Sequence, residues 1–245
     1  MQHLLRRKII VYTILLVSMA PVTLFAQRYS SDINLPNHDE KPFRFGISLG
    51  MNRAFYKFTH HPSFQLQDSV LGIESINSSG IQLAWLVNMR LSEHFDLRTY
   101  PLNLVFTEKA FQYSLKYPDR FRDEDSITTR KVQSISMALP IQIKFSSDRI
   151  RNFKVYMIAG GRIEYDFAAT SGAKNAENLI KLNKIDYGIE GGIGFHFYFP
   201  YFVLSPELKF GYGLRNVHSR DNDLKFSNTI DKINSRIFNF SLIVE

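Results

Sequence analysis

The clearest pattern in the chain is the strict alternation of apolar and polar residues over positions 132–145, VQSISMALPIQIKF. Ile135 and Leu139 fall on one face of this run, whereas Ser134 and Lys144 fall on the other. A period of two residues is typical of a β-strand and excludes an amphipathic helix. The run exceeds the usual strand length of about 5–6 residues and reaches the roughly 9–11 residues that cross a bilayer. It therefore predicts a strand with lipid on one side and a polar lumen on the other.

The same alternation recurs in seven further runs along the chain. They cover residues 44–52, 80–90, 95–117, 154–167, 185–199, 204–215 and 238–245. In the run that begins at residue 95, the apolar phase slips by one residue beside Pro101, which indicates a β-bulge. Long and short connections alternate between the runs. The long ones cover residues 59–78, 118–131, 170–184 and 216–234.

These eight runs predict an all-β fold, an eight-stranded antiparallel up-and-down transmembrane β-barrel of the outer-membrane type. Such barrels have an even number of strands, short periplasmic turns and longer external loops. A water-soluble barrel or sandwich has the same period but places its apolar face inside. The charges decide between the two, because those in mid-strand share the polar face and the opposite faces have essentially none. We therefore expect a barrel over residues 44–245 in the outer membrane.

The N-terminus has the features of an export signal. Arg6-Arg7-Lys8 precedes an apolar run over residues 9–19, and a small residue, Ala26, stands before Gln27. This order predicts a secretory signal peptide over residues 1–26, cleaved near Ala26. The alternative is an anchoring helix, but the run is shorter than the roughly 20 residues that a membrane span needs. Residues 27–43 are polar and have no periodicity, so we expect a flexible periplasmic lead there.

Composition excludes several kinds of chemistry. The chain has no cysteine, which rules out disulfides, thiolate metal sites and cysteine nucleophiles. Its formal charge is +7, but the sequence contains no basic stripe with interleaved aromatics. Nucleic acid is therefore not an expected partner. The seven histidines form no metal or nucleophile motif, and the acidic run at 123–125 lacks the spacing of a calcium loop. We predict no catalytic residue, cofactor, metal or small-molecule substrate. Membrane lipid is the expected partner of the barrel wall.

The charges on the polar face are predicted to fill the lumen. Eight strands enclose just enough room for side chains, so we do not expect conduction. Buried charges must be paired, and we expect an ion-pair network of Lys144, Arg162, Glu164, Asp186, Glu190, Glu207 and Lys209. Arg162 and Lys154 are expected beside Glu164, Asp186 or Glu190. Lys209 is expected beside Glu207, and Lys144 beside Glu207 or Glu190. A structural core is the main interpretation, with a proton path or a catalytic site as the alternative.

Several segments resemble the PorT family of outer-membrane β-barrels of the Bacteroidetes. The resemblance runs through most of the chain after residue 26 and is carried by residues 95–106, 139–145, 149–153, 186–199, 205–210 and 233–238. Its most specific pieces are Ser205-Pro206-Glu207 and Asn234-Ser235-Arg236-Ile237-Phe238. The resemblance implies a non-enzymatic accessory role in type IX secretion, the export of proteins with C-terminal sorting domains. It implies no catalytic residues.

Two other classes of function stay open. A generic small outer-membrane barrel would act as an adhesin or stabilise the envelope, and a lipid-modifying enzyme would alter outer-membrane lipid. If secretion is the function, other type IX components or cargo are the expected partners. The partner contacts are expected either in the long loops or in the periplasmic turn over residues 146–152, where Arg149 and Arg151 are the candidate residues. The alternative for these two arginines is a solvated basic turn.

Overall fold

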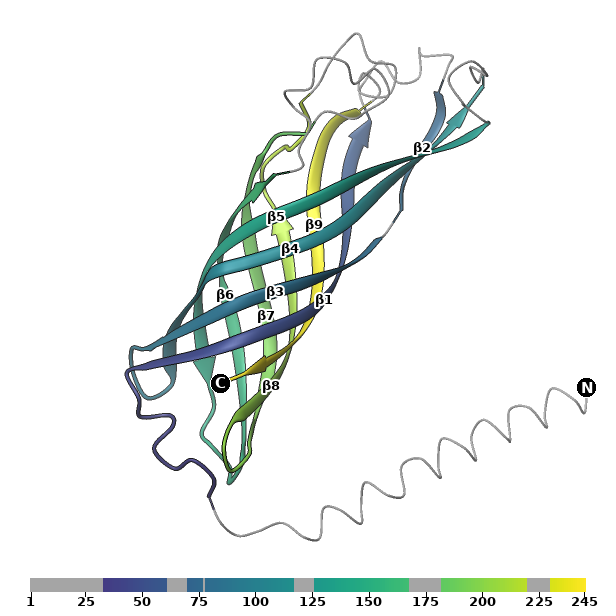
Figure 1. The fold of residues 1–245 in the computed structure, drawn as a ribbon. Coiled ribbons are helices and arrows are strands. Elements are labelled where there is room, and N and C mark those ends of the chain that lie inside the picture. Colours follow the sequence, from purple (N-terminus) through teal and green to yellow (C-terminus); the bar gives the residue numbers. More distant parts are fainter. Residues whose placement is uncertain (1–32, 61–69, 77, 117–125, 168–181, 220–229) are drawn as a thin grey trace, which may run out of the picture. The chain divides into compact units, whose positions relative to one another are not determined.

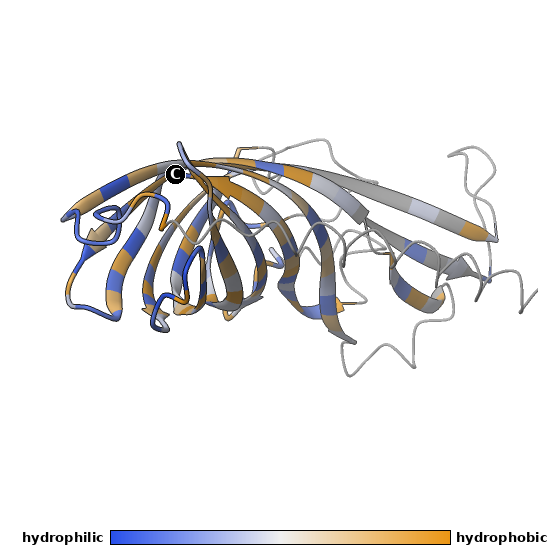
Figure 2. Cartoon of the chain, turned by 90° about the horizontal axis from the view of Figure 1, so that it is seen from below, coloured by the Kyte–Doolittle hydropathy of each residue, from blue (hydrophilic) through white to orange (hydrophobic). Residues whose placement is uncertain are grey.

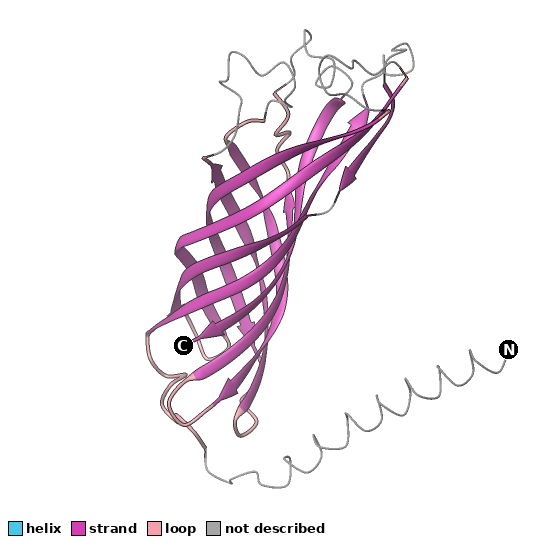
Figure 3. Cartoon of the chain, turned by 45° about the vertical axis from the view of Figure 1, so that its right-hand side comes forward, coloured by secondary structure: helices cyan, strands magenta, loops and turns pink. Residues whose placement is uncertain are grey.

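The computed structural model describes residues 33–60, 70–76, 78–116, 126–167, 182–219 and 230–245. The predicted signal peptide, residues 1–26, lies outside the described residues. The chain divides into two units, Met1–Ile33 and Asn34–Glu245, and the second contains all the strands. All regular structure in the described part is β-strand (Figure 3). No helix among these residues is long and apolar enough to cross a membrane.

Nine strands form one closed antiparallel sheet (Figure 1). They are β1 (Phe43–His60), β2 (Val70–Ile76), β3 (Ser78–Arg90), β4 (Phe95–Leu115), β5 (Ile127–Ser146), β6 (Phe153–Asp166), β7 (Ile185–Tyr198), β8 (Val203–Gly213) and β9 (Ile230–Val244). β2 and β3 pair with successive parts of β4, so together they form one strand of the barrel wall. The order continues β3-β1-β9-β8-β7-β6-β5, and the pairing of β4 with β5 closes the barrel. The predicted eight-stranded antiparallel barrel is confirmed.

The wall has an apolar outer face and a polar inner face, and Figure 2 shows the resulting alternation of hydropathy along the strands. On β1, the outward side chains from Phe43 to Met51 are between 53% and 68% exposed. The intervening Ser48 and Asn52 are 2% and 3% exposed. Large exposed apolar residues recur on all the other seven wall strands. Such a surface requires lipid rather than water around it, as the alternation predicts.

The predicted bulge in the strand that begins at residue 95 is confirmed. Pro101 and Leu102, although consecutive, are both exposed on the outer face of β4. The register with β5 shifts between Thr99 and Leu104, and the register with β3 shifts opposite the same stretch. Proline fits here because it has no backbone N–H to donate to a ladder.

The wall is taller on one side than the sequence predicts. β1, β4 and β5 have 18, 21 and 20 residues, whereas β8 has 11. Three predicted loops are therefore strand in part, over residues 59–60 and 70–76, 127–131, and 230–234. The apolar–polar alternation stops where a strand leaves the lipid. Strand pairing beyond the bilayer therefore cannot be predicted from the hydrophobic pattern.

Candidate functional site

The centre of the lumen is occupied by Arg98, which projects from β4 and is fully buried. Its Nη1 donates a hydrogen bond to Glu207 Oε2 at 2.6 Å, and its Nε donates one to Asn88 Oδ1 at 2.8 Å. Glu245 lies 3.8 Å from the same guanidinium. Two carboxylates from different strands thus neutralise one cation across the barrel. The fork of the guanidinium suits this role because its several donors can serve several acceptors at once.

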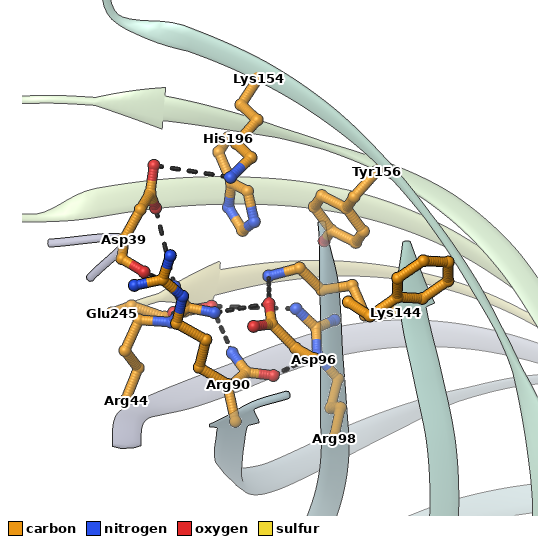
Figure 4. Close-up of polar contacts among 12 residues, drawn as sticks. Asp39, Arg44, Arg90, Asp96, Arg98, Lys144, Lys154, Tyr156, His196 and Glu245 are labelled. Carbon is orange, nitrogen blue, oxygen red and sulfur yellow. Dashed lines mark hydrogen bonds and ion pairs between the residues drawn. The ribbon is translucent and has the colours of Figure 1, made fainter. Parts of the chain in front are cut away.

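A second cluster lies toward the periplasmic end (Figure 4). Asp96 is shared by Arg44 at 2.5 Å and Lys144 at 3.0 Å. Lys144 was expected beside Glu207 or Glu190, and the structure instead places it beside Asp96 on the adjacent strand. The pairing of Asp96 with Lys144 in the β4–β5 register explains this, because directly opposed residues share a face and are near neighbours.

Aromatic rings fill the lumen beside these charges. Tyr156 is 1% exposed, donates a hydrogen bond to Glu207 at 2.8 Å and stacks on His196 with 4.4 Å between ring centroids. Gly194 makes room for this ring, because a Cβ at Gly194 would overlap it. Tyr100 is equally buried, with the Lys209 ammonium 4.7 Å from its ring centroid. The middle of the lumen is therefore packed with side chains.

The predicted network residues all face the lumen, and those other than Lys144 fall into two groups. In the middle, Lys209 lies 3.7 Å from Glu207, as expected, and Glu190 accepts a hydrogen bond from Gln142. Toward the extracellular end, Arg162 lies 3.2 Å from Glu164, one of its expected partners. In this upper group Ser235 donates to Asp186 and also accepts from Arg162 at 3.3 Å. The seven residues thus form polar contacts at three levels of the lumen, and Arg162, Glu190 and Lys209 line one small cavity between the upper two levels.

The periplasmic mouth is covered by residues 34–42, which we call the cap. Asn34 donates from its backbone N–H to Asn152 Oδ1 and from its side chain to Tyr198 O, both at 2.9 Å. Arg149 donates to the backbone oxygens of Asn34 and Leu35, and its guanidinium lies 3.6 Å from the centroid of the Tyr198 ring. The sequence predicts a flexible lead over residues 27–43, whereas its described part is docked. Polar contacts hold this segment in place, and such contacts do not produce a periodic hydrophobic pattern in the sequence.

Asp39 ties the cap to the lumen charges. Both of its carboxylate oxygens accept from the Tyr198 hydroxyl, at 2.8 and 2.9 Å, and Lys154 lies at 3.5 Å. Lys154 was expected beside Glu164, Asp186 or Glu190, but those acids lie nearer the other end of the barrel. Burial opposes ionisation of Asp39, but Lys154, the Tyr198 hydrogen bond and Arg44 outweigh it and lower the pKa of Asp39. The carboxylate form therefore favours docking of the cap.

The two candidate partner-contact arginines differ in their surroundings. Arg149 is half-buried and committed to the cap, so it is not a free basic group. Arg151 is exposed and adopts the left-handed backbone conformation, with φ of 55°. Its backbone oxygen accepts from Arg149 Nε at 2.7 Å. Of the two, only Arg151 presents its charge to the periplasm.

Four lumen residues of the central clusters are absent from the predicted network: Arg44, Asp96, Arg98 and Glu245. Their signal was present, since Asp96 and Arg98 alternate with the outward Phe95 and Leu97. The irregular phase of β4 obscured it. Glu245 falls on the polar face of the last predicted strand, next to the outward Val244, so its position in the lumen follows from the same alternation.

The side chains in the lumen close the barrel and do not form an accessible reactive site. Ser205 and His196 lie 2.6 Å apart, a pairing found in nucleophilic sites, but both are buried in the packed lumen, where no substrate reaches them. Among the described residues, no group of three or more His, Cys, Asp or Glu side chains is placed to hold a metal ion. The geometry supports a structural core that closes the barrel.

Comparison with known proteins identifies the kind of barrel. The sequence profile of the outer membrane protein beta-barrel domain matches residues 25–219. No curated protein matches the chain significantly. Similar solved structures include Neisserial surface protein A, with 12% identity, a TM-score of 0.41 and coverage of 83% of this chain and 99% of that one. OprG from Pseudomonas aeruginosa gives 10% identity, a TM-score of 0.43 and coverage of 81% and 93%.

A third similar structure, Ail of Yersinia pestis, gives 10% identity, a TM-score of 0.38 and coverage of 83% of this chain and 99% of that one. The match of the domain profile covers well over half of the chain. The closed barrel and its lipid-facing wall agree with that match. The chain belongs to the outer membrane protein beta-barrel domain family.

Proposed function

We propose that this outer-membrane barrel is a non-enzymatic accessory component of type IX protein secretion that acts through its surfaces and not as a channel. The observation that supports it most is the sealed lumen, in which Arg98, Tyr156 and Glu207 bridge the interior. A barrel closed in this way can act only through contacts made by its periplasmic face, its external loops or its lipid-facing wall.

The resemblance to the PorT family supplies the specific system. Its segments contribute directly to the seal, because residues 205–210 carry Glu207 and Lys209 and residues 139–145 carry Lys144. Residues 149–153 include Arg149 and Asn152, which hold the cap. In this proposal, the capped periplasmic face meets other secretion components or cargo.

The decisive experiment is deletion of the gene followed by analysis of secreted proteins. Unprocessed cargo trapped in the periplasm, with export restored by the wild-type chain, is the expected result. Intact export would contradict the proposal and favour a generic barrel with an adhesin or envelope-stabilising role. A changed outer-membrane lipid composition with intact export would instead indicate a lipid-modifying enzyme.

Complementation with point variants tests the periplasmic contact. Arg151→Glu reverses an exposed charge without touching the cap contacts, so we expect it to reduce export while the barrel still folds. Lys184→Glu, also exposed but at the opposite end of β7, is the matched control. Export that is equal in the two variants would remove Arg151 from the proposed contact. Arg149→Glu is less informative, because it also releases the cap.

A further inference from the structure

A cluster of cations lies on the outer wall of β1 and β9, directly beyond the lipid-facing band. Along β1 the outward side chains are apolar up to Met51 and are followed by Arg53 and Lys57. Along β9 they are apolar from Val244 to Phe238. Beyond Phe238, toward the extracellular end, the outward charged residues are Arg236 and Lys232. We call Arg53, Lys57, Lys232 and Arg236 the basic patch.

The β-sheet register brings these side chains together. Phe55, between Arg53 and Lys57, is directly opposite Arg236, and Lys57 is opposite Asn234. Arg236 is therefore a diagonal neighbour of both β1 cations, at a separation of about 7–8 Å. One anionic group of the size of a phosphate can lie between side chains at this spacing.

Among the described residues, the patch has no acidic partner. None of its four residues forms an ion pair with another described residue. Arg236 is held with its guanidinium 4.9 Å from the centroid of the Tyr212 ring, and its buried Nε has no hydrogen-bond partner in the described part of the chain. A guanidinium that is held in place by a ring and has no carboxylate partner among the described residues favours an external anion.

The height of the patch indicates which anion. Arg53 lies ten residues beyond Phe43 on β1, which corresponds to a climb of roughly 25 Å at about 3.3 Å per residue along a strand tilted by roughly 40°. The apolar band of such barrels is about 25 Å tall. Arg53 therefore lies close to the boundary between acyl chains and headgroups in the outer leaflet.

The outward strand positions at the extracellular ends of β6 and β7 carry no such charges. The outward residues at the extracellular ends of β6 and β7 are Tyr165, Phe167, Ile185 and Tyr187. Aromatic and aliphatic ends of this kind are sufficient to place a strand at a bilayer interface. Cations are therefore not required at a strand end for insertion, and their presence on β1 and β9 favours a role in recognition.

We propose that the basic patch binds the phosphate groups of an outer-leaflet lipid, a phosphorylated glycolipid of the lipid A type. Its headgroup phosphate lies among Arg53, Lys57 and Arg236, and its acyl chains lie against the apolar wall below, at Met51 and Phe238. Guanidinium groups bind phosphate with paired, charge-assisted hydrogen bonds. This site is independent of the role in secretion and assigns the barrel a preferred lipid on one side.

The test uses the folded chain in phosphatidylcholine nanodiscs to which bisphosphorylated lipid A is added, with retained lipid measured by native mass spectrometry. The triple variant Arg53→Gln, Lys57→Gln and Arg236→Gln is compared with the wild type. The matched control, Lys41→Gln, Arg151→Gln and Lys184→Gln, removes three exposed cations elsewhere. Heat-modifiable gel mobility establishes that each variant is folded, and the single variants Arg236→Gln and Lys57→Gln replace the triple if it is not.

We expect the triple variant to bind lipid A about tenfold more weakly, because each exposed charge pair contributes a factor of roughly 1.4 to 5. The control should bind like the wild type, and added salt should weaken wild-type binding. Equal retention in the patch variants and the wild type would overturn the proposal. So would equal loss in the control, equal binding of dephosphorylated lipid A, or displacement of the lipid by inorganic phosphate at the same phosphate concentration.

Discussion

The two ends of the lumen solve the problem of buried charge differently. In the middle and periplasmic parts, cations and carboxylates from several strands share partners, and Arg98 and Glu207 are both fully shielded from solvent. At the extracellular end, Arg162 and Glu164 are 6% and 12% exposed. There Asp166 and Glu164 accept hydrogen bonds from Ser134 and Ser136.

This difference in charge pairing indicates which part of the barrel is sealed. Charges that cannot reach water require opposite charges at close range, and a lost partner is costly there. Near the extracellular mouth, hydroxyl groups and solvent complete the coordination of the acids, so each ion pair has less effect. The cap adds a further cover at the periplasmic end. Stability and closure should therefore depend more on the periplasmic and central residues than on the extracellular ones.

The largest expected effect is that of Arg98→Met. It leaves Glu207 and Glu245 without their shared cation in a closed interior, and breaking a buried pair in this way costs about 3–5 kcal/mol. Urea unfolding in lipid vesicles, followed by the fluorescence of Trp85, the single tryptophan, measures the change in free energy of unfolding. Adding Glu207→Gln should recover part of the loss. If Arg98→Met alone were as stable as the wild type, the central charges would not need their partners.

Gly194→Ala should have the next largest effect. The added methyl group displaces the Tyr156 ring and with it the hydrogen bond to Glu207, and overpacking of this kind costs about 1–3 kcal/mol. Gly161→Ala is the matched control, because Gly161 faces outward with no atom closer than 3.8 Å to a Cβ there. The same unfolding measurement should separate the two variants, and equal stability would mean that Tyr156 does not need this space.

Arg162→Met tests the extracellular tier. We expect a loss of about 1–2 kcal/mol, because the partly exposed Glu164 keeps access to water and to Ser136 after the arginine is removed. Unfolding experiments that compare Arg162→Met directly with Arg98→Met sharpen the contrast between the two ends. A loss as large as that of Arg98→Met would show that the extracellular end is sealed as tightly as the centre.

Asp39→Asn should have the smallest effect on global stability but should release the cap. The pKa of Asp39 is lowered from its ordinary value of 3.8, so the docked cap gains stability from the carboxylate above that pH. This contribution is lost as the pH falls through the lowered pKa. Hydrogen exchange in residues 34–42 measures it, with fast exchange expected in Asp39→Asn at neutral pH and in the wild type only below about pH 4. Unchanged protection in Asp39→Asn would contradict the role of this carboxylate.

The alternation of the chain predicts the barrel because each outward position must meet lipid and each inward position must not. The inward placement of Lys144, Arg162 and Glu207 follows from position parity alone. The identity of their ion-pair partners does not follow from parity, because neighbours across a lumen depend on the tilt and stagger of the strands. Lys144 beside Asp96 is a consequence of the β4–β5 register.

Two other features lie beyond what the pattern can predict. The cap is held by backbone oxygens and by Asp39, and such contacts require no repeated residue type. The extensions of β1, β4 and β5 beyond the bilayer are paired through their backbones, so either face can be polar. The basic patch was visible as residues but not as a cluster, because only the β1–β9 register brings Arg236 between Arg53 and Lys57.

The most direct test of the sealed lumen is electrical conductance across a planar lipid bilayer that contains the folded barrel. We predict no steady conductance for the wild type, because Arg98, Tyr100 and Tyr156 fill the cross-section. Reproducible ohmic steps from the wild-type barrel would contradict the account, since they require a continuous water path through these side chains.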